Sequence, residues 1–289
     1  MPDARILALK LFSRLSLPIN HAIGAAVGGL IAILPLRQVR HADINLRRCM
    51  PELSARRRRQ IRRRSFMHLG RMATESGRLW LGDPHRQVRL IREVRGLELL
   101  EQAQQQGRGV LLASPHIGSW EMLNLYFALH HPLTAMYKPQ RGPVNEVIRH
   151  SRERLGSRMV TATPGGVRSL LRALERGELA GVLPDRAGVN GSVFAEFFGH
   201  QVLTPTLTTR LAARTGAPVL FAIGERLPLA RGYRIHLRAG PADIANADEQ
   251  AGARALNRGL EECIRAFPEQ YWWSFRRFRK RPAGEPRWY

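Results

Sequence analysis

The segment 114–121, with the sequence SPHIGSWE, places a histidine and a glutamate five positions apart. On one continuous helix, about 100° per residue would separate their side chains by about 140°. They can meet if His116 lies in a loop and Glu121 lies in the first turn of a following helix. Gly118 permits an unusual backbone angle in such a loop, and Ser119 is a good N-cap. Such a contact would form a His116–Glu121 pair, in which the carboxylate fixes the imidazole tautomer and makes the other nitrogen a better base.

A histidine base without an enzyme nucleophile suits direct transfer, in which a substrate hydroxyl loses its proton and attacks a carbonyl. The chain has no G-x-S-x-G elbow, no H-E-x-x-H and no Gly-rich phosphate loop. Its two cysteines, Cys49 and Cys263, are far apart and typical of small buried residues. We expect neither a metal nor a cofactor. Judged on spacing alone, His116 is more often an ordinary loop histidine with a satisfied hydrogen bond than a member of a catalytic pair.

Short apolar runs alternate with helical periodicity from about residue 95 onward. The runs predict strands at 109–114, 133–138, 158–163, 179–184, 217–224 and 233–239. The periodic segments predict helices at 97–106, 119–130, 143–155, 165–176, 205–215 and 247–267. This alternation indicates an α/β fold with a largely parallel central sheet flanked by helices. His116 and Asp185 follow two of these strands, so we expect them at the same sheet edge, sharing one cleft.

The segment 17–36 contains no charged residue and is about as long as the ~20 residues that cross a bilayer. We interpret it as a membrane anchor that either spans the bilayer or lies half-embedded, with a buried core helix as the alternative. More Lys and Arg residues follow this segment than precede it, which predicts that the rest of the chain stays in the cytoplasm. A long helix is expected over 51–81. The predicted organisation is an N-terminal membrane anchor and basic helical arm, 1–94, and an α/β domain, 95–289.

The charge is strongly positive, with 46 Lys and Arg against 23 Asp and Glu, a net of +23. Such a chain attracts nucleic acid, anionic lipid or an acidic protein. A nucleic-acid site interleaves aromatic residues with its basic ones, whereas the arginine-rich segment 55–64 has no aromatic residue. Because this segment follows the apolar run, we expect it at an anionic lipid surface, where each basic residue contributes about 1 kcal/mol of attraction. The pattern argues against a nucleic-acid partner.

Five sequence blocks together resemble one protein family. SPHIGSWE resembles the H-x-x-x-x-D/E block of the glycerolipid acyltransferase superfamily, and in particular its late acyltransferases of lipid A biosynthesis. The other blocks that resemble this branch are NLRRCMPELSARRRR (45–59), MYKPQRGPVNEVIRHSRERLG (136–156), LPDRAGVNGSVFAEFFGHQVLTPT (183–206) and PEQYWWSFRRFRKRP (268–282). The resemblance covers residues 17–282, and its five blocks occur in the family's order.

The resemblance implies an enzyme on the cytoplasmic face of the inner membrane. Such an enzyme moves a fatty acyl chain from an acyl carrier protein thioester, or sometimes a coenzyme A thioester, to a hydroxyl of a lipid A precursor. The expected partners are therefore acyl carrier protein, an anionic lipid or lipid A precursor, and the membrane. By resemblance, His116 is the general base and Glu121 orients it. The open alternative is a superfamily member that acylates a lysophospholipid or another glycolipid.

The same resemblance assigns substrate-binding residues. The resemblance implies that one arginine of the block 136–156 takes part in catalysis or substrate binding, and Arg152 and Arg154 are both candidates. Asp185 matches the acidic residue of the block 183–206. Arg226 matches an arginine that the family is expected to place near a phosphate or glycan. The chain departs from the family at three positions. Lys138 stands where arginine is usual, Arg186 where glutamine or histidine is usual, and Phe275 where histidine is usual, which leaves the acceptor open.

Overall fold

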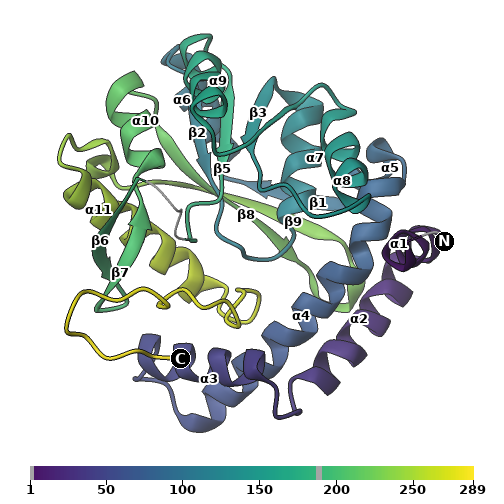
Figure 1. Ribbon diagram of the computed structural model, residues 1–289. Helices are drawn as coiled ribbons and strands as arrows, with labels where there is room; N and C mark the ends of the chain where they lie inside the picture. Colours follow the sequence, from purple (N-terminus) through teal and green to yellow (C-terminus); the bar gives the residue numbers. More distant parts are fainter. Residues whose placement is uncertain (1–2, 187–190) are drawn as a thin grey trace.

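The computed structural model describes residues 3–186 and 191–289. A seven-stranded sheet lies at the centre, in the order β1-β9-β8-β2-β5-β3-β4, with helices on both faces (Figure 1). Neighbouring strands in it are parallel except β8 and β9. The strands are β1 (Ile91–Arg95), β2 (Val110–Ala113), β3 (Leu133–Met136), β4 (Arg158–Val160), β5 (Leu179–Val182), β8 (Val219–Arg226) and β9 (Tyr233–Ala239). This confirms the predicted α/β class.

Helices and one small hairpin complete the fold. The first four helices are α1 (Ala4–Arg14), α2 (Leu17–Ile31), α3 (Arg37–Cys49) and α4 (Ala55–Leu81). The others are α5 (Pro84–Val88), α6 (Leu97–Gln105), α7 (Trp120–His130), α8 (Val144–Glu153), α9 (Pro164–Glu175), α10 (Leu207–Thr215) and α11 (Glu249–Ala266). The hairpin is formed by β6 (Ser192–Phe197) and β7 (His200–Pro205), and two short 3-10 turns follow β8 and β9.

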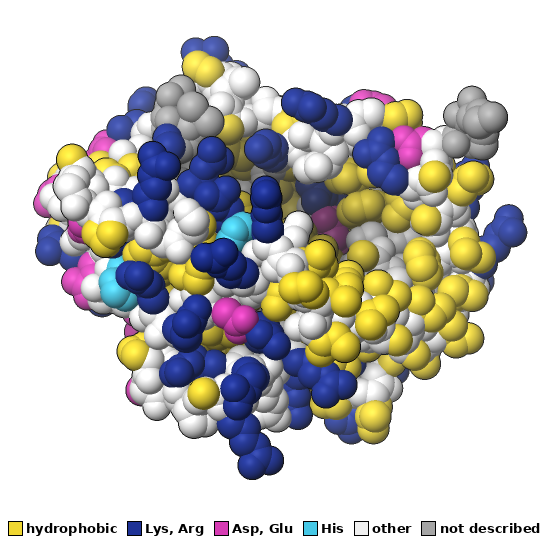
Figure 2. Space-filling view, turned by 60° about the horizontal axis from the view of Figure 1, so that its bottom comes forward, with side chains coloured by type: hydrophobic (Ala, Val, Ile, Leu, Met, Phe, Trp, Pro, Cys, Tyr) yellow, Lys and Arg dark blue, Asp and Glu magenta, His cyan; other side chains and the backbone are white. Residues whose placement is uncertain are grey.

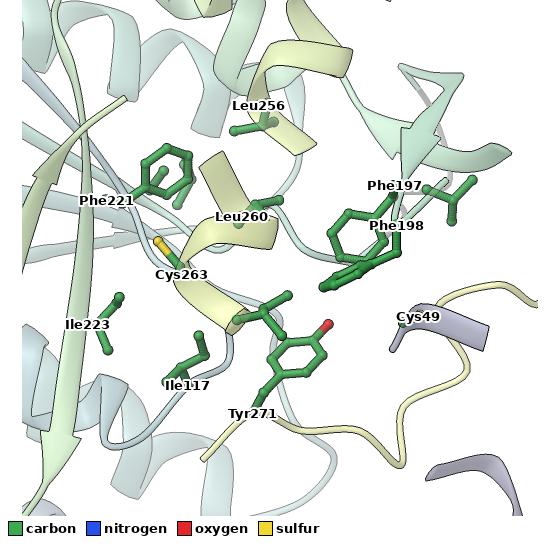
Figure 3. Packing of buried hydrophobic residues seen from close by; sticks show 14 of the residues in the cluster. Cys49, Ile117, Phe197, Phe198, Phe221, Ile223, Leu256, Leu260, Cys263 and Tyr271 are labelled. Carbon is green, nitrogen blue, oxygen red and sulfur yellow. The ribbon is translucent and has the colours of Figure 1, made fainter. Parts of the chain in front are cut away.

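The core has two layers because side chains alternate across the sheet. In β2, Leu111 and Ala113 face a cluster that includes residues of α9, α10 and α11, whereas Val110 and Leu112 face a cluster with α6 and α7. Figure 3 shows the first layer, where residues of α11 and the C-terminal segment pack beside Phe197 and Phe198. That cluster also contains residues of α3 and α4, so the predicted arm and the sheet share one core.

Both cysteines lie in this core, as the sequence predicts. Cys49 and Cys263 are free thiols, and both are buried. Burial raises the pKa of the Cys263 thiol to about 12 and raises that of Cys49 well above its ordinary value. Thiols with so little thiolate are poor nucleophiles, so the cysteines act as small packing residues.

All six predicted strands and all six predicted helices of the α/β region exist, with ends within a few residues of the expected positions. Three strands had no counterpart in the prediction: β1, β6 and β7. The segment 197–199, FFG, has the geometry of a hairpin turn, with positive φ at Phe198 and Gly199.

The apolar segment 17–36 forms α2 and a turn before α3. No helix within the described residues has both the length and the apolar composition to span a membrane. One side of α2 packs against α4 through glycines: a Cβ on Gly24 would come within 2.6 Å of the Arg71 nitrogen, and one on Gly28 would overlap the Phe66 carbonyl. The other side carries large exposed apolar residues. The segment is therefore packed on one side and exposed on the other.

This contact predicts opposite effects for two adjacent glycines of α2. We expect Gly28→Ala to lower the free energy of unfolding by about 1–3 kcal/mol, because the new methyl group overlaps the α4 backbone. Gly29→Ala, the matched control, meets only the flexible Met67 side chain at 3.7 Å. It should raise stability by about 0.5–1 kcal/mol through helix propensity. Urea unfolding of both variants measures the difference, and equal stabilities would show that the helices do not pack this closely.

Candidate active site

The register of the sheet brings His116 and Asp185 together. Strands β2 and β5 are parallel neighbours, with Ala113 opposite Val182 at their carboxyl ends. His116 and Asp185 each follow their strand by three residues, so the two loops leave the same edge side by side. The prediction that these two residues lie at the same sheet edge is confirmed.

The imidazole of His116 is held by Asp185. Its Nδ1 lies 2.6 Å from Oδ1 of Asp185, and the His116 backbone N–H donates to Oδ2 at 3.0 Å. The side chain of His116 is 12% exposed and that of Asp185 only 2%. Among the described residues, Nε2 of His116 has no hydrogen-bond partner. This geometry corrects the expected contact between His116 and Glu121, because Asp185 is the carboxylate on the imidazole.

Charge balance fixes the tautomer of His116. Burial by itself would raise the pKa of the Asp185 carboxyl, but the His116 imidazole and the Arg186 guanidinium outweigh it, and the pKa lies below its ordinary value. Asp185 is therefore ionised near neutral pH and can only accept hydrogen bonds. Nδ1 of His116 must carry the proton, which leaves the lone pair on Nε2.

Glu121 is paired with an arginine instead. It lies in the first turn of α7, as predicted, and is buried. Arg152 of α8 binds it through two hydrogen bonds, Nη2 to Oε1 at 2.5 Å and Nε to Oε2 at 3.0 Å. Burial lowers the pKa of Arg152, but the Glu121 charge outweighs this and raises it. A bidentate pair of this kind holds α7 and α8 in a fixed relation.

Aromatic rings surround the imidazole of His116. Its ring centroid lies 5.0 Å from that of Trp120 and 6.0 Å from that of Trp272, and the two indoles stack on each other. The guanidinium of Arg186 lies 4.3 Å from the ring centroids of both Trp272 and Phe275. The departures at 186 and 275 therefore contact each other, and Arg186 also interacts with Asp185.

The loop from His116 to Ser119 is fixed by backbone contacts. Gly118 has a φ of +60°, as its predicted role requires, and a Cβ there would overlap the carbonyl oxygen of Gly224 in β8. The N–H of Ser119 donates to that same oxygen at 2.7 Å. The N–H of Gly118 donates to the Gln270 carbonyl, and that of Trp272 donates to the His116 carbonyl. The C-terminal segment thus supports the loop from one side and β8 from the other.

The two candidate arginines of the block 136–156 bind different partners. Arg152 binds Glu121, whereas Arg154 donates to the carbonyls of Leu79 and Gly82 at 2.8 and 2.7 Å. Those carbonyls belong to the C-terminal end of α4, where exposed acceptors need partners. Arg154 is therefore a helix-capping residue, whereas Arg152 pairs with the residue that directly follows Trp120.

Two further predicted residues make no hydrogen bond to His116 or Asp185 among the described residues. Lys138 is exposed in the segment after β3. Arg226 is almost fully buried, and its guanidinium binds Glu75 of α4, with Nη2 to Oε1 at 2.6 Å and Nε to Oε2 at 2.9 Å. The prediction that Arg226 contacts phosphate or glycan stays a prediction, and in this structure its Nε and Nη2 are both used by Glu75.

Sequence reasoning missed Glu75 and the partner role of Asp185. The sequence did hold a signal for Asp185, since His116 and Asp185 each come within two residues of the end of an apolar run. Glu75 gave no such signal, because it is a single glutamate within a long helix. Within the described residues, no group of three His, Cys, Asp or Glu side chains is arranged to hold a metal ion.

A histidine held by a buried carboxylate at the carboxyl edge of a parallel sheet, with its second nitrogen free, is an arrangement typical of enzymes that remove a proton from a substrate hydroxyl. Residues 4–280 match the bacterial lipid A biosynthesis acyltransferase family. The chain belongs to this family and is an O-acyltransferase, as its sequence motifs predicted.

Several curated proteins are similar to the chain over most of its length. The lipid A biosynthesis lauroyltransferase of Escherichia coli K12 is 30% identical over 280 residues, which cover 96% of this chain and 91% of that protein. The palmitoleoyltransferase of the same organism is 32% identical over 279 residues, covering 96% and 90%. A lipid A biosynthesis acyltransferase of Haemophilus influenzae is 30% identical over 255 residues, covering 86% and 78%.

Proposed function

We propose that this protein transfers a fatty acyl chain from an acyl carrier protein thioester, or a coenzyme A thioester, to a hydroxyl of a lipid A precursor. The observation that carries the proposal is the 2.6 Å contact between His116 Nδ1 and Asp185, which leaves Nε2 as a base. Family membership supports the lipid A precursor as acceptor. No cofactor takes part, because the thioester donor itself supplies the activated acyl group.

Proton transfer by His116 accounts for each step of this reaction. Nε2 takes the proton of the acceptor hydroxyl, whose oxygen attacks the thioester carbonyl and forms a C–O bond. The C–S bond of the tetrahedral intermediate then breaks, and the leaving thiolate receives the proton from the imidazolium. Asp185 stabilises that imidazolium through Nδ1 without accepting its proton. The enzyme returns to its starting protonation state after each cycle.

The surroundings of His116 suit an acyl donor. The indoles of Trp120 and Trp272 give the imidazole an apolar boundary, which favours a fatty chain and limits water. The Glu121–Arg152 pair fixes α7, the helix that begins at Trp120. Arg186, between Trp272 and Phe275, supplies a positive charge near the reacting atoms. Such a charge attracts the oxyanion of the intermediate or an anionic substrate group.

The acceptor is tested with purified protein and defined substrates. Acyl carrier protein and coenzyme A thioesters of one fatty acid are each mixed with a lipid A precursor, a lysophospholipid or a glycolipid. Mass spectrometry should show one added acyl chain on the lipid A precursor. Acylation of only the lysophospholipid or glycolipid would support the alternative acceptor class. In cells, loss of the gene should remove one secondary acyl chain from lipid A.

We propose that the protein binds the cytoplasmic face of the inner membrane through α1, α2 and the turn after α2. Exposed apolar residues follow helical spacing along α2, at Ile19, Ile23, Val27 and Leu30, and continue at Ile33 and Leu34. Figure 2 shows a broad apolar area on this side, beside a recess on the same face. Arg37 and Arg40 are exposed directly after it. An apolar face flanked by basic residues is typical of helices lying in an anionic membrane surface.

A charge placed in this face should weaken membrane binding. Val27 is 50% exposed, so burial of its remaining surface in lipid contributes about 1 kcal/mol, and a carboxylate at this position would in addition have to be desolvated. We expect Val27→Glu to weaken binding to vesicles containing anionic lipid by about 10-fold or more. Ala213→Glu adds the same charge on an exposed position of α10, away from α2, and should change binding much less (Figure 1). Vesicle co-sedimentation measures both, and equal losses would exclude α2 as the binding face.

A further inference from the structure

A fully buried carboxylate lies at the meeting point of the N-terminal helices and the sheet. Glu75, in the C-terminal third of α4, accepts hydrogen bonds from four side chains. They are Ser119 (2.7 Å, to Oε1), Arg226 (2.6 Å to Oε1 and 2.9 Å to Oε2), Tyr233 (2.9 Å, to Oε2) and His21 (2.9 Å, Oε2 to Nε2). We call these five residues the Glu75 cluster. All five are buried.

The Glu75 cluster is saturated and ionised. Burial alone would raise the pKa of the Glu75 carboxyl, but Arg226 and His21 outweigh it and hold the pKa below its usual range. A carboxylate has about four acceptor positions, and the partners of Glu75 occupy them all. A buried charge that is so fully bonded has one favoured geometry, because losing any bond leaves a polar group unpaired.

The partners of Glu75 come from four separate parts of the chain. His21 lies on α2, Arg226 and Tyr233 lie at adjoining ends of β8 and β9, and Ser119 is the last residue before α7. Ser119 occupies the N-cap position of α7, but its side chain makes no capping hydrogen bond. Its hydroxyl donates to Glu75 instead. The residue that ends the His116 loop is thus attached to α4 rather than to its own helix.

We propose that the Glu75 cluster, through Ser119, is a positioning device for His116. The inference rests on the proposed acyl transfer. Ser119 lies three residues after His116, and the segment between them has its backbone fixed by Gly224 and Gln270. With one end held by Asp185 and the other by Glu75, the loop aims Nε2 of His116 at the acceptor hydroxyl. Small displacements of such a group cost large factors in rate, so Glu75 acts on turnover without touching substrate.

Two single-hydroxyl deletions on the same carboxylate test this role. Ser119→Ala removes the bond that links Glu75 to the His116 loop, and Tyr233→Phe removes one that links it to β9. Each leaves Arg226 and His21 in place, and each should lower the melting temperature to a similar extent. We expect Ser119→Ala to lower kcat by about 10-fold with little change in KM, and Tyr233→Phe to lower it by about 2-fold at most.

A second readout is independent of acyl transfer. The proton shared by His116 Nδ1 and Asp185 should give a low-field NMR resonance, assigned by its absence in His116→Asn. We expect this resonance to shift or broaden in Ser119→Ala and to stay unchanged in Tyr233→Phe. Identical resonances and equal kcat in the two variants would overturn the positioning role. Absence of transfer by the wild-type enzyme would instead refute the proposed function, and the NMR comparison would still decide the role of Ser119.

Discussion

Replacement of His116 with alanine is expected to lower kcat by about 10³-fold, the middle of the range for losing a general base. The reason is that Nε2 is the nitrogen with a free lone pair beside the aromatic boundary of the site. KM for the donor should change little, since the imidazole acts on the acceptor hydroxyl. Steady-state kinetics with saturating thioester and lipid acceptor measures the effect.

A matched variant separates this chemistry from stability. His116→Ala leaves the buried Asp185 charge without its side-chain partner, which destabilises the fold. His116→Asn places an amide N–H near the position of Nδ1, so it can still donate to Asp185 but cannot act as a base. Both variants should be inactive, and the asparagine variant should melt closer to the wild type. Near wild-type turnover by either one would exclude His116 as the base.

Asp185→Asn is expected to lower kcat by about 10²–10³-fold while the protein stays folded. Asp185 accepts from two donors, the backbone N–H and Nδ1–H of His116. An amide has one oxygen, so asparagine either loses one of these bonds or donates to Nδ1 and places the imidazole proton on Nε2. In that second tautomer, the nitrogen facing the substrate has no lone pair. The pH dependence of kcat/KM measures the change, since its acid limb reports the base of the free enzyme.

Glu121→Gln is the comparison that decides which carboxylate orients His116. Glutamine weakens the bidentate pair with Arg152, so the variant should lose thermal stability. The acid limb of its pH profile should stay where it is in the wild type, because Glu121 does not contact the imidazole. If Glu121→Gln moved that limb and Asp185→Asn did not, the assignment of Asp185 would be wrong and the pair predicted from the sequence would be restored.

The α/β fold was predictable because local patterns carry most of it. Parallel strands buried on both faces read as continuous apolar runs, and 109–114 and 179–184 are of this kind. The missed strand β1 has the sequence IREVR and lies at a sheet edge, where charged side chains remain exposed. Strands β6 and β7 form a separate hairpin, whose turn contains a non-glycine residue with positive φ. Neither pattern is distinctive in sequence.

The candidate site was predictable in its parts and not in its pairing. His116 and Asp185 were expected in one cleft, and Glu121 in the first turn of a helix. Which carboxylate meets the imidazole depends on the register between β2 and β5, a contact between residues 69 positions apart in sequence. The burial of Arg226 against Glu75 joins residues 151 positions apart. Only the packed sheet and helices decide between such alternatives.

The glycine contact between α2 and α4 has a consequence for the proposed membrane binding. At Gly24 and Gly70 the two backbones lie so close that α2 has little space to roll or slide along α4. Because α4 also carries Glu75, which binds Ser119 of the His116 loop, the proposed lipid-binding face of α2 is connected to that loop through packed helices. On the proposed mode of binding, this packing would hold His116 at a set height above the bilayer. Headgroup size would then be a criterion for selecting acceptors.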